Sequence, residues 1–156
     1  IAFKRGEDPV FFLEYWNNPE ATEEKYKGEW ACSSDLGVKD EDGRFWFKGR
    51  KDDVIISAGY RIGPTEIEES LIRHPAVALA AVVPQPDELR GNIVKAFIKL
   101  AEGCVPYVGL TREIQDFVKN NLAAHEYPRE IEFIDELPMT TTGKIRRRDL
   151  RNSNAD

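Results

Sequence analysis

The residues best suited to chemistry lie near the end of the chain, in a polar loop that carries one lysine. Residues 140–143 are three threonines and a glycine, and Lys144 follows them directly. This run has no apolar side chain to bury, so a loop is expected, with Pro138 ending the element before it. A primary amine on a flexible, glycine-hinged arm can be brought to an anion. A solvated surface loop with a basic tail explains the same residues, because most lysines are surface lysines.

Two familiar kinds of site are excluded by residue spacing. A Walker A loop requires a glycine five residues before Gly143, and Pro138 occupies that position. His74 and His125 lie far apart, without a cysteine or carboxylate cluster at metal-ligand spacing, so we expect no metal site. A further candidate is Asp35, whose carboxylate can accept hydrogen bonds from a diol or simply close a turn.

The composition is that of a soluble globular protein with one domain, or with one domain and a fragment of another. The chain has 156 residues, of which 41% are hydrophobic and 32% are charged. Its net charge of −6 argues against a general nucleic-acid binder. No apolar run reaches the ~18 residues of a membrane helix, and no signal-peptide pattern opens the chain.

The cysteines indicate the redox compartment of the protein, and the first residue indicates whether the chain is part of a longer one. Cys32 and Cys104 have no disulfide framework around them and fit a reducing compartment, so a cytoplasmic location is expected. The chain opens at Ile1 without a methionine, which is expected of a piece cut from a longer protein.

The first fifty residues are expected to form one short charged helix and a β-meander. Asn18 is a good helix cap and Pro19 a good first helical residue, with the helix extending towards Lys27. The meander turns at the Asp-Gly pair that ends with Gly43. Its predicted strands are residues 30–32, 36–39 and 44–49.

The remaining residues predict an α+β fold, in which a small mixed sheet is flanked by helices. Residues 49–53 are glycine or charged and mark a hinge between two domains. We therefore divide the chain into residues 1–50, residues 51–152 and a tail at 153–156. The expected elements of the second part are a strand at 54–56, a small-residue loop at 57–63, a helix at 64–74, a strand at 76–83, a turn at 84–87, a strand at 92–100, a helix capped by Thr111 and a strand at 131–134.

Several separated motifs, in order, resemble the adenylate-forming enzymes, a superfamily of acyl-CoA synthetases, luciferases and the adenylation domains of peptide synthetases. They are residues 49–55, residues 59–68 and the lysine loop at 137–144. Arg90-Gly91 and the Tyr-Pro-Arg run at 127–129 are most similar to short- and medium-chain acyl-CoA synthetases. The resemblance covers nearly the whole chain.

The resemblance implies a fold and a reaction. In such enzymes a large N-terminal domain binds ATP, with its Mg²⁺, and a carboxylic acid, while a small C-terminal lid swings between two poses. One pose forms the acyl-adenylate, and the other transfers the acyl group to the thiol of CoA. This chain resembles only the end of the large domain, as a β-meander, and the whole lid. The phosphate loop of the family is absent from it, so the chain alone is expected to be inactive.

The resemblance also assigns roles to individual residues. Lys144 corresponds to the catalytic lysine, which places a fixed positive charge on the carboxylate and α-phosphate oxygens. Asp35 and Arg50 correspond to the residues that bind the ribose of the nucleotide, although Ser34 replaces a glycine that the family usually has before this aspartate. Asp52 falls on the hinge. The positions that correspond to CoA contacts are Ala58, Gly59, Tyr60, Arg61, Arg90, Tyr127 and Arg129.

Two other functions fit some of the same residues. An adenylation unit that loads a carrier protein would use the same pantetheine thiol, and the lid separates the two poorly. A stand-alone module could bind phosphate or nucleic acid through its basic end, at Lys144, Arg146, Arg147, Arg148 and Arg151. The overall acidity argues against the second function, and no nucleic-acid partner is expected.

Overall fold

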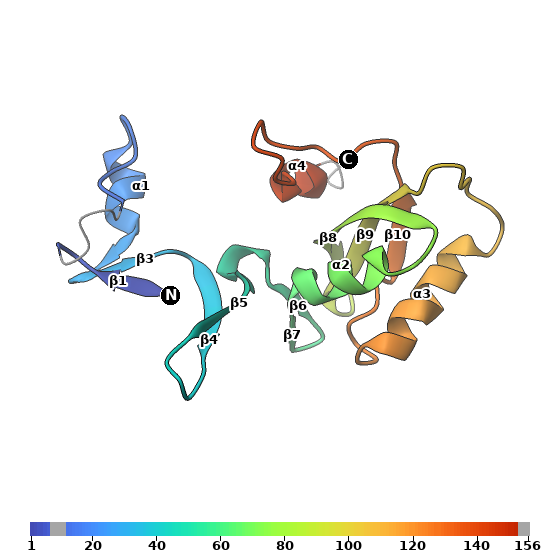
Figure 1. The fold of residues 1–156 in the computed structure, drawn as a ribbon, viewed down its shortest axis with the longest axis horizontal. Coiled ribbons are helices and arrows are strands. Elements are labelled where there is room, and N and C mark those ends of the chain that lie inside the picture. Colours follow the sequence, from blue (N-terminus) through green and yellow to red (C-terminus); the bar gives the residue numbers. More distant parts are fainter. Residues whose placement is uncertain (7–11, 153–156) are drawn as a thin grey trace. The chain divides into compact units, whose positions relative to one another are not determined.

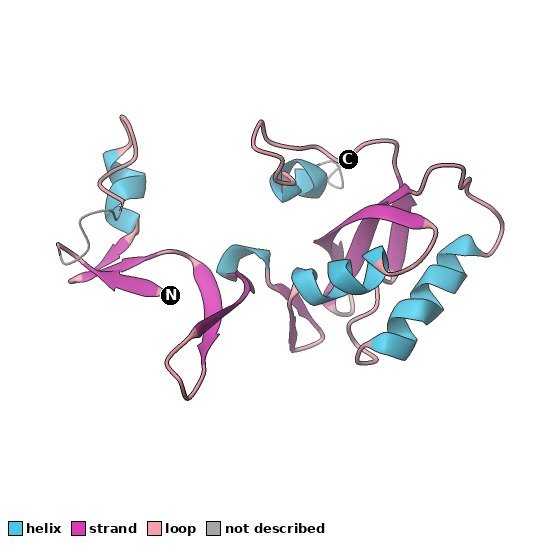
Figure 2. Cartoon of the chain, viewed as in Figure 1, coloured by secondary structure: helices cyan, strands magenta, loops and turns pink. Residues whose placement is uncertain are grey.

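The computed structural model describes residues 1–6 and 12–152, and contacts between Cα atoms divide the chain into two compact units. The first unit is Ile1–Asp52 and the second is Asp53–Asp156. Figure 1 shows the elements of each unit in sequence colours, and Figure 2 shows their helices and strands. The tail predicted at residues 153–156 lies outside the described residues.

A small antiparallel sheet and one helix begin the first unit. The sheet has the order β1-β3-β2, formed by β1 (Ala2–Lys4), β2 (Tyr26–Lys27) and β3 (Trp30–Cys32). Helix α1 (Pro19–Glu24) begins as predicted, because the Oδ1 of Asn18 accepts a hydrogen bond of 3.0 Å from the backbone N–H of Ala21. The helix ends before Lys27, and the two outer strands were not predicted.

The strands of the predicted β-meander are divided between two sheets, because β3 lies in the first sheet and the strands β4 (Asp35–Lys39) and β5 (Phe45–Arg50) form a separate hairpin whose turn is held by Asp40. These two strands pair in antiparallel fashion, and Gly43 has a φ of +82° in the turn, as predicted. The carboxylate of Asp40 accepts hydrogen bonds of 2.8 Å from the indole N–H of Trp46 and from the backbone N–H of Arg44. These two hydrogen bonds lower the pKa of Asp40.

The second unit is the predicted α+β fold with a mixed sheet. Strand β9 (Gly91–Leu100) lies in the middle, antiparallel to β8 (Val77–Asp87) and parallel to β10 (Glu130–Phe133). Before the sheet come a short 3₁₀ helix (Lys51–Asp53) and a hairpin of β6 (Ile55–Ser57) and β7 (Tyr60–Ile62). The helices are α2 (Pro64–Ile72), α3 (Leu110–Asn121) and α4 (Arg147–Asn152).

Alternate residues of the sheet strands face two separate apolar clusters, as the period of two in a strand requires. Ala80, Val82 and Ala96 pack into the larger cluster, which also contains buried residues of α2 and α3. Ala81 and Phe97 face the other way and pack with Leu137 and Leu150. Thus α2 and α3 cover one face of the sheet, and the segment around the lysine loop covers the other (Figure 1).

Four local predictions for the second unit are wrong. Residues 84–87 are not a turn but the end of β8, which pairs with β9 as far as Asp87. This strand lies at the sheet edge, where prolines without an N–H are tolerated. The loop predicted at 57–63 contains the hairpin turn at Ala58 and Gly59 and the strand β7, which pairs with β6. Thr111 does not cap α3, because Gly109, with a φ of +102°, occupies the cap position and Leu110 begins the helix. Helix α2 also ends at Ile72 rather than at residue 74.

No helix in the described part of the chain is long and apolar enough to cross a membrane. Within residues 1–6 and 12–152, no group of three or more His, Cys, Asp or Glu side chains is arranged to hold a metal ion.

Candidate functional site

The lysine loop is a closed turn rather than the flexible arm that the sequence suggested. Met139 and Ile145 form an antiparallel bridge across its base. The backbone N–H of Thr140 donates to the carbonyl of Lys144 at 2.8 Å, and the N–H of Lys144 donates back to the Thr140 hydroxyl at 3.0 Å. Gly143 provides the left-handed residue of the turn, with a φ of +78°. The backbone of Lys144 is therefore fixed, while its side chain is exposed to solvent.

Both stems of this loop are anchored in the core of the second unit. Leu137, before the loop, is 6% exposed, and Leu150, after it, is 5% exposed. They share one apolar cluster with Phe97 of the central strand, and Ile145 packs against that cluster. The N–H of Arg146 also donates to the carbonyl of Pro138 at 2.8 Å. The sheet therefore determines where the loop lies.

The arginines around the loop are mostly occupied by carboxylates. Arg146 forms an ion pair of 3.0 Å with Asp149. Arg147 binds both carboxylate oxygens of Glu68 and also contacts Asp53, which additionally binds Arg151. A nucleic-acid-binding surface needs cations that are available to phosphates. These ion pairs therefore disfavour the basic-end module.

The first group of expected CoA contacts lies on the β6–β7 hairpin. Ala58 has a φ of +48° and Gly59 a φ of +85°, so both central residues of this two-residue turn are left-handed, as in a type I′ turn. The N–H of Ala58 donates to the carbonyl of Arg90 at 3.0 Å, and the side-chain amide of Asn92 donates to the carbonyl of Ile56 at 3.1 Å. The hairpin turn is thus fastened to the turn between β8 and β9.

The second group of expected CoA contacts, Tyr127 and Arg129, is connected to the hairpin by an aromatic stack. The rings of Tyr60 and His125 are stacked with centroids 4.1 Å apart and planes 18° from parallel. Tyr127 and Arg129 follow His125 in the chain and are fixed by hydrogen bonds. The Arg129 guanidinium donates to the Tyr127 hydroxyl at 3.0 Å, and the backbone N–H of Arg129 donates to the carbonyl of Val94 at 2.8 Å. The structure therefore brings the expected CoA residues together at one end of the second unit.

Two neighbours of this group were missed by the sequence interpretation. His125 forms the stack with Tyr60, and the ammonium of Lys119 lies 4.1 Å from the centre of the Tyr127 ring. Lys119 lies in the last turn of α3. The predicted end of this helix shortly before Tyr127 is the sequence signal that could have indicated that the two residues are neighbours. No pattern in the sequence pairs His125 with Tyr60, which lies 65 residues earlier in the chain.

The lysine loop and the CoA group lie at different edges of the second unit. In Figure 1 the loop that precedes α4 is at the upper edge, whereas the β6–β7 hairpin is at the lower edge. The lysine loop and the β6–β7 hairpin are therefore separate features of the second unit.

The two expected ribose contacts are neighbours in the first unit. Asp35 and Arg50 are directly paired across β4 and β5. Ser34 adopts a left-handed φ of +66°. Arg50 also donates to the carboxylate of Asp52 at 3.0 Å, so the expected ribose and hinge residues contact one another.

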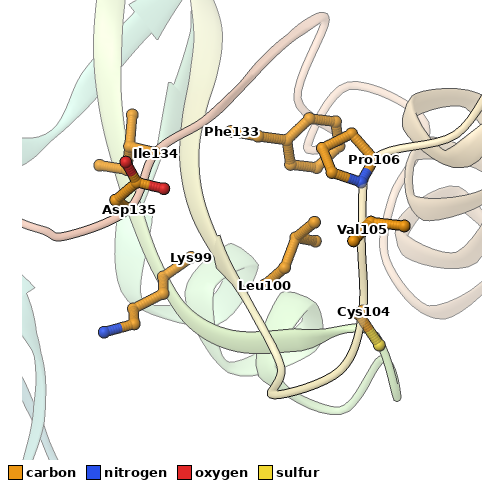
Figure 3. A pocket seen from close by; sticks show the side chains of 8 residues that line it. All are labelled: Lys99, Leu100, Cys104, Val105, Pro106, Phe133, Ile134 and Asp135. Carbon is orange, nitrogen blue, oxygen red and sulfur yellow. The ribbon is translucent and has the colours of Figure 1, made fainter.

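A pocket of about 380 Å³ beside β9 contains none of the expected site residues (Figure 3). Leu100, Phe133 and Pro106 line it with apolar side chains, and Lys99 and Asp135 add charged ones.

A family model and known proteins match this chain. The model of the AMP-binding enzyme C-terminal domain matches residues 66–144, about half of the chain and including Lys144. The chain belongs to this family. It is 55% identical over 154 residues to acyl-coenzyme A synthetase ACSM4, mitochondrial, of Mus musculus, covering 97% of this chain and 27% of that protein. It is 51% identical over 152 residues to acetyl-coenzyme A synthetase of Bacillus subtilis, covering 97% and 26%.

Solved structures of adenylate-forming enzymes have the same fold. The ATP-bound RpMatB-BxBclM chimera B1 matches with a TM-score of 0.87 and 32% identity, covering 99% of this chain and 32% of that one. The anthranilate CoA ligase AuaEII in complex with anthranoyl-AMP matches with a TM-score of 0.81 and 42% identity, covering 91% and 28%. The chain spans about a quarter of the length of the curated relatives described above.

Proposed function

We propose that this chain is the C-terminal part of an AMP-forming acyl-CoA synthetase, an acid–thiol ligase. The observation that carries the proposal is the similarity of 97% of the chain to two enzymes named as CoA synthetases, each at more than 50% identity. Those names also favour CoA over a carrier protein as the thiol acceptor. The substrates of the full-length enzyme would be a small carboxylic acid, ATP with Mg²⁺, and CoA.

The reaction has two balanced steps. The carboxylate attacks the α-phosphorus of ATP, forming acyl-AMP and releasing pyrophosphate. The CoA thiol then attacks the acyl carbonyl, forming the thioester and releasing AMP, while the thiol proton goes to solvent. Lys144 would serve the first step, because an ammonium group stabilises the negative charge that gathers on the carboxylate and phosphate oxygens.

The domain division of the enzyme follows from the same proposal. Residues 1–50 would be the end of the large domain, with Asp35 and Arg50 at the ribose, and residues 51–152 would be the lid. Asp52 would be the hinge residue, and the division of contacts between Asp52 and Asp53 supports this assignment. Rotation about this point would bring either edge of the lid to the nucleotide.

The second step would use the group of residues around the β6–β7 hairpin. Arg61, Arg90 and Arg129 supply guanidinium groups suited to the phosphates of CoA. The contacts that gather expected CoA residues around the β6–β7 hairpin, which in Figure 1 lies apart from the lysine loop, support a division of labour between the two poses. The reducing environment suggested by the unpaired cysteines supports a cytoplasmic location, although the mouse relative is named as mitochondrial.

The test is product analysis with the full-length enzyme that carries these residues. With acid and ATP alone, it should exchange labelled pyrophosphate into ATP, and added CoA should produce acyl-CoA and AMP in equal amounts. The 156-residue chain alone should do neither, because it lacks most of the length of its relatives. Release of ADP instead of AMP would contradict the proposal.

A further inference from the structure

A cluster of ion pairs joins the end of the lysine loop to two distant parts of the second unit. Arg147, the first residue of α4, lies three positions after Lys144. Its Nη2 donates to the two carboxylate oxygens of Glu68 at 2.6 and 2.9 Å, and its Nη1 donates to Asp53 at 3.3 Å. Arg151, one turn later, also binds Asp53. We call Arg147, Glu68, Asp53 and Arg151 the α4 latch.

The α4 latch is better shielded than an ordinary surface ion pair. The side chains of Arg147, Glu68 and Asp53 are 22%, 11% and 13% exposed. Pairing of one guanidinium with both oxygens of a carboxylate is stronger than a single contact and also fixes the relative orientation of the two groups. By contrast, the neighbouring pair of Arg146 with Asp149 is about half exposed and contributes little.

The carboxylates of the latch are held in place themselves. The Oε1 of Glu68 accepts a hydrogen bond of 2.8 Å from the backbone N–H of Val82, so this side chain is attached to strand β8 as well as to α2. Asp53 is the first residue of the second unit and directly follows the proposed hinge residue Asp52. The latch therefore ties the start of α4 both to the sheet and to the hinge segment.

The remaining anchors of the loop cannot replace this contact. Leu137 and Leu150 determine how deeply the stems are buried, but apolar contacts are non-directional. The hydrogen bonds between Thr140 and Lys144, and the one from the Arg146 N–H to the Pro138 carbonyl, join the loop and its stems to one another and do not orient the loop towards the rest of the unit. The bidentate pair of Arg147 supplies the missing directional contact.

We propose that the α4 latch is a positioning cluster that directs Lys144 and couples its loop to the hinge segment. The proposal rests on the function assigned above, in which Lys144 serves adenylation. An enzyme with a misdirected lysine would still fold, but it would stabilise the transition state of the first step less well. In the proposed function, acyl transfer to CoA does not use Lys144, so its rate should not change when the latch is altered.

The test uses Arg147→Lys in the full-length enzyme. Lysine keeps the charge and most of the stem, but it loses the bidentate geometry. The rate of acid-dependent pyrophosphate exchange should fall roughly ten- to a hundredfold, as expected for a misplaced catalytic group, with KM for ATP unchanged. Conversion of pre-formed acyl-adenylate and CoA to acyl-CoA should stay within about twofold of the original rate, because the misplaced group takes no part in that step.

Two further variants keep the test decisive. Arg146→Lys is the matched control, because it changes the adjacent arginine and only an exposed ion pair, and it should leave both half-reactions unchanged. Glu68→Gln keeps an acceptor for Val82 but removes the charge, and it should reproduce the selective loss. The double variant Arg147→Lys with Glu68→Gln should lose less than the product of the two single effects.

Three outcomes overturn the proposal. Equal loss of both half-reactions with a lower melting temperature would make the latch purely structural. Unchanged pyrophosphate exchange in Arg147→Lys and Glu68→Gln would show that Lys144 is directed by other contacts. If Lys144→Ala selectively loses adenylation but Arg147→Lys does not, the positioning role of the latch is wrong, while the proposed function stands. The proposed function fails separately, if Lys144→Ala leaves adenylation intact.

Discussion

At the scale of single residues, Lys144 combines a fixed backbone with an exposed side chain. We predict that Lys144→Ala lowers acyl-adenylate formation about 10²–10³-fold, since losing a charged group that stabilises a transition state costs ~3–4 kcal/mol. Formation of acyl-CoA from pre-formed acyl-adenylate should continue at the original rate. The measurement is the rate of each half-reaction in the full-length enzyme.

Thr141→Ala is a suitable control for this prediction. Thr141 is exposed in the same turn, whereas the hydroxyls of Thr140 and Thr142 lie 2.9 Å apart and contact one another. This variant should leave both half-reactions unchanged. A fall in the second half-reaction of Lys144→Ala, equal to the fall in the first, would show that the lysine serves both poses.

Gly59 has a conformational role that the structure makes plain. With a φ of +85°, it occupies a region that L side chains rarely adopt, although a Cβ at this position would meet no other atom within 4 Å. Gly59→Ala should therefore destabilise the lid by about 1 kcal/mol but retain both half-reactions. We predict that Gly59→Leu has the same strain and, in addition, loses acyl-CoA formation while keeping pyrophosphate exchange.

The two substitutions at Gly59 separate strain from obstruction. Melting temperatures and half-reaction rates of both variants are the measurements required. If Leu and Ala impair the enzyme to the same extent, the glycine serves the turn alone, and its proposed place beside the pantetheine arm is wrong.

Sequence motifs could identify candidate residues but not their partners. Lys144, Arg90 and the Tyr-Pro-Arg run stand out by their local pattern. The contact of Arg147 with Glu68 joins residues 79 positions apart, and no local pattern encodes it. The left-handed φ of Ser34 was equally hidden, because serine carries no turn signal comparable to that of glycine.

At the scale of elements, one buried amine bridges the parallel strands β9 and β10. The Nζ of Lys95 lies 2.9 Å from a carboxylate oxygen of Glu130 and 2.9 Å from one of Glu132. Burial acts to lower the pKa of Lys95, but the hydrogen bonds to these two glutamates outweigh it and raise the pKa above 10.5.

We predict that Lys95→Met lowers the free energy of unfolding by about 1–3 kcal/mol at pH 7, because it leaves two adjacent carboxylates without their cation. A raised pKa in the folded state means that the lysine stabilises the fold fully below pH 10.5 and loses this effect as the pH rises through its folded value. The difference between the two proteins should therefore shrink above pH 10.5. Urea unfolding at neutral pH and at a pH above the folded pKa measures it, and a difference that persists undiminished would contradict the charge effect.

The elements that were predicted well from the sequence were those in which apolar residues follow a long, regular pattern. The buried strands β8 and β9 and the helix α3 carry long apolar patterns, and they were found nearly in place. Residues 84–87 failed because two prolines are normally a turn signal, whereas an edge strand leaves their missing N–H groups without consequence. The three-residue strand β7 is too short to show any period, whereas β6 is close to the strand predicted at 54–56.

At the scale of the whole molecule, the contacts separate at Asp52, where the proposed hinge lies. We predict that limited digestion of the chain with trypsin cuts first after Arg50 or Lys51, both of which are exposed. Mass spectrometry of the early fragments would identify the site. Initial cleavage after Lys95 or Lys99, within the central strand, would contradict the boundary.

The α4 latch also affects the order in which the second unit can be assembled. Asp53 opens this unit, and Arg147 and Arg151 lie 94 and 98 positions further on. Contacts between such distant residues form late in folding, because a long loop must close first. During synthesis from the amino end, Asp53 and Glu68 emerge well before their arginines. Lys144 would therefore gain its working orientation only after the sheet is complete, so a ribosome-bound or partly folded lid would carry no competent lysine.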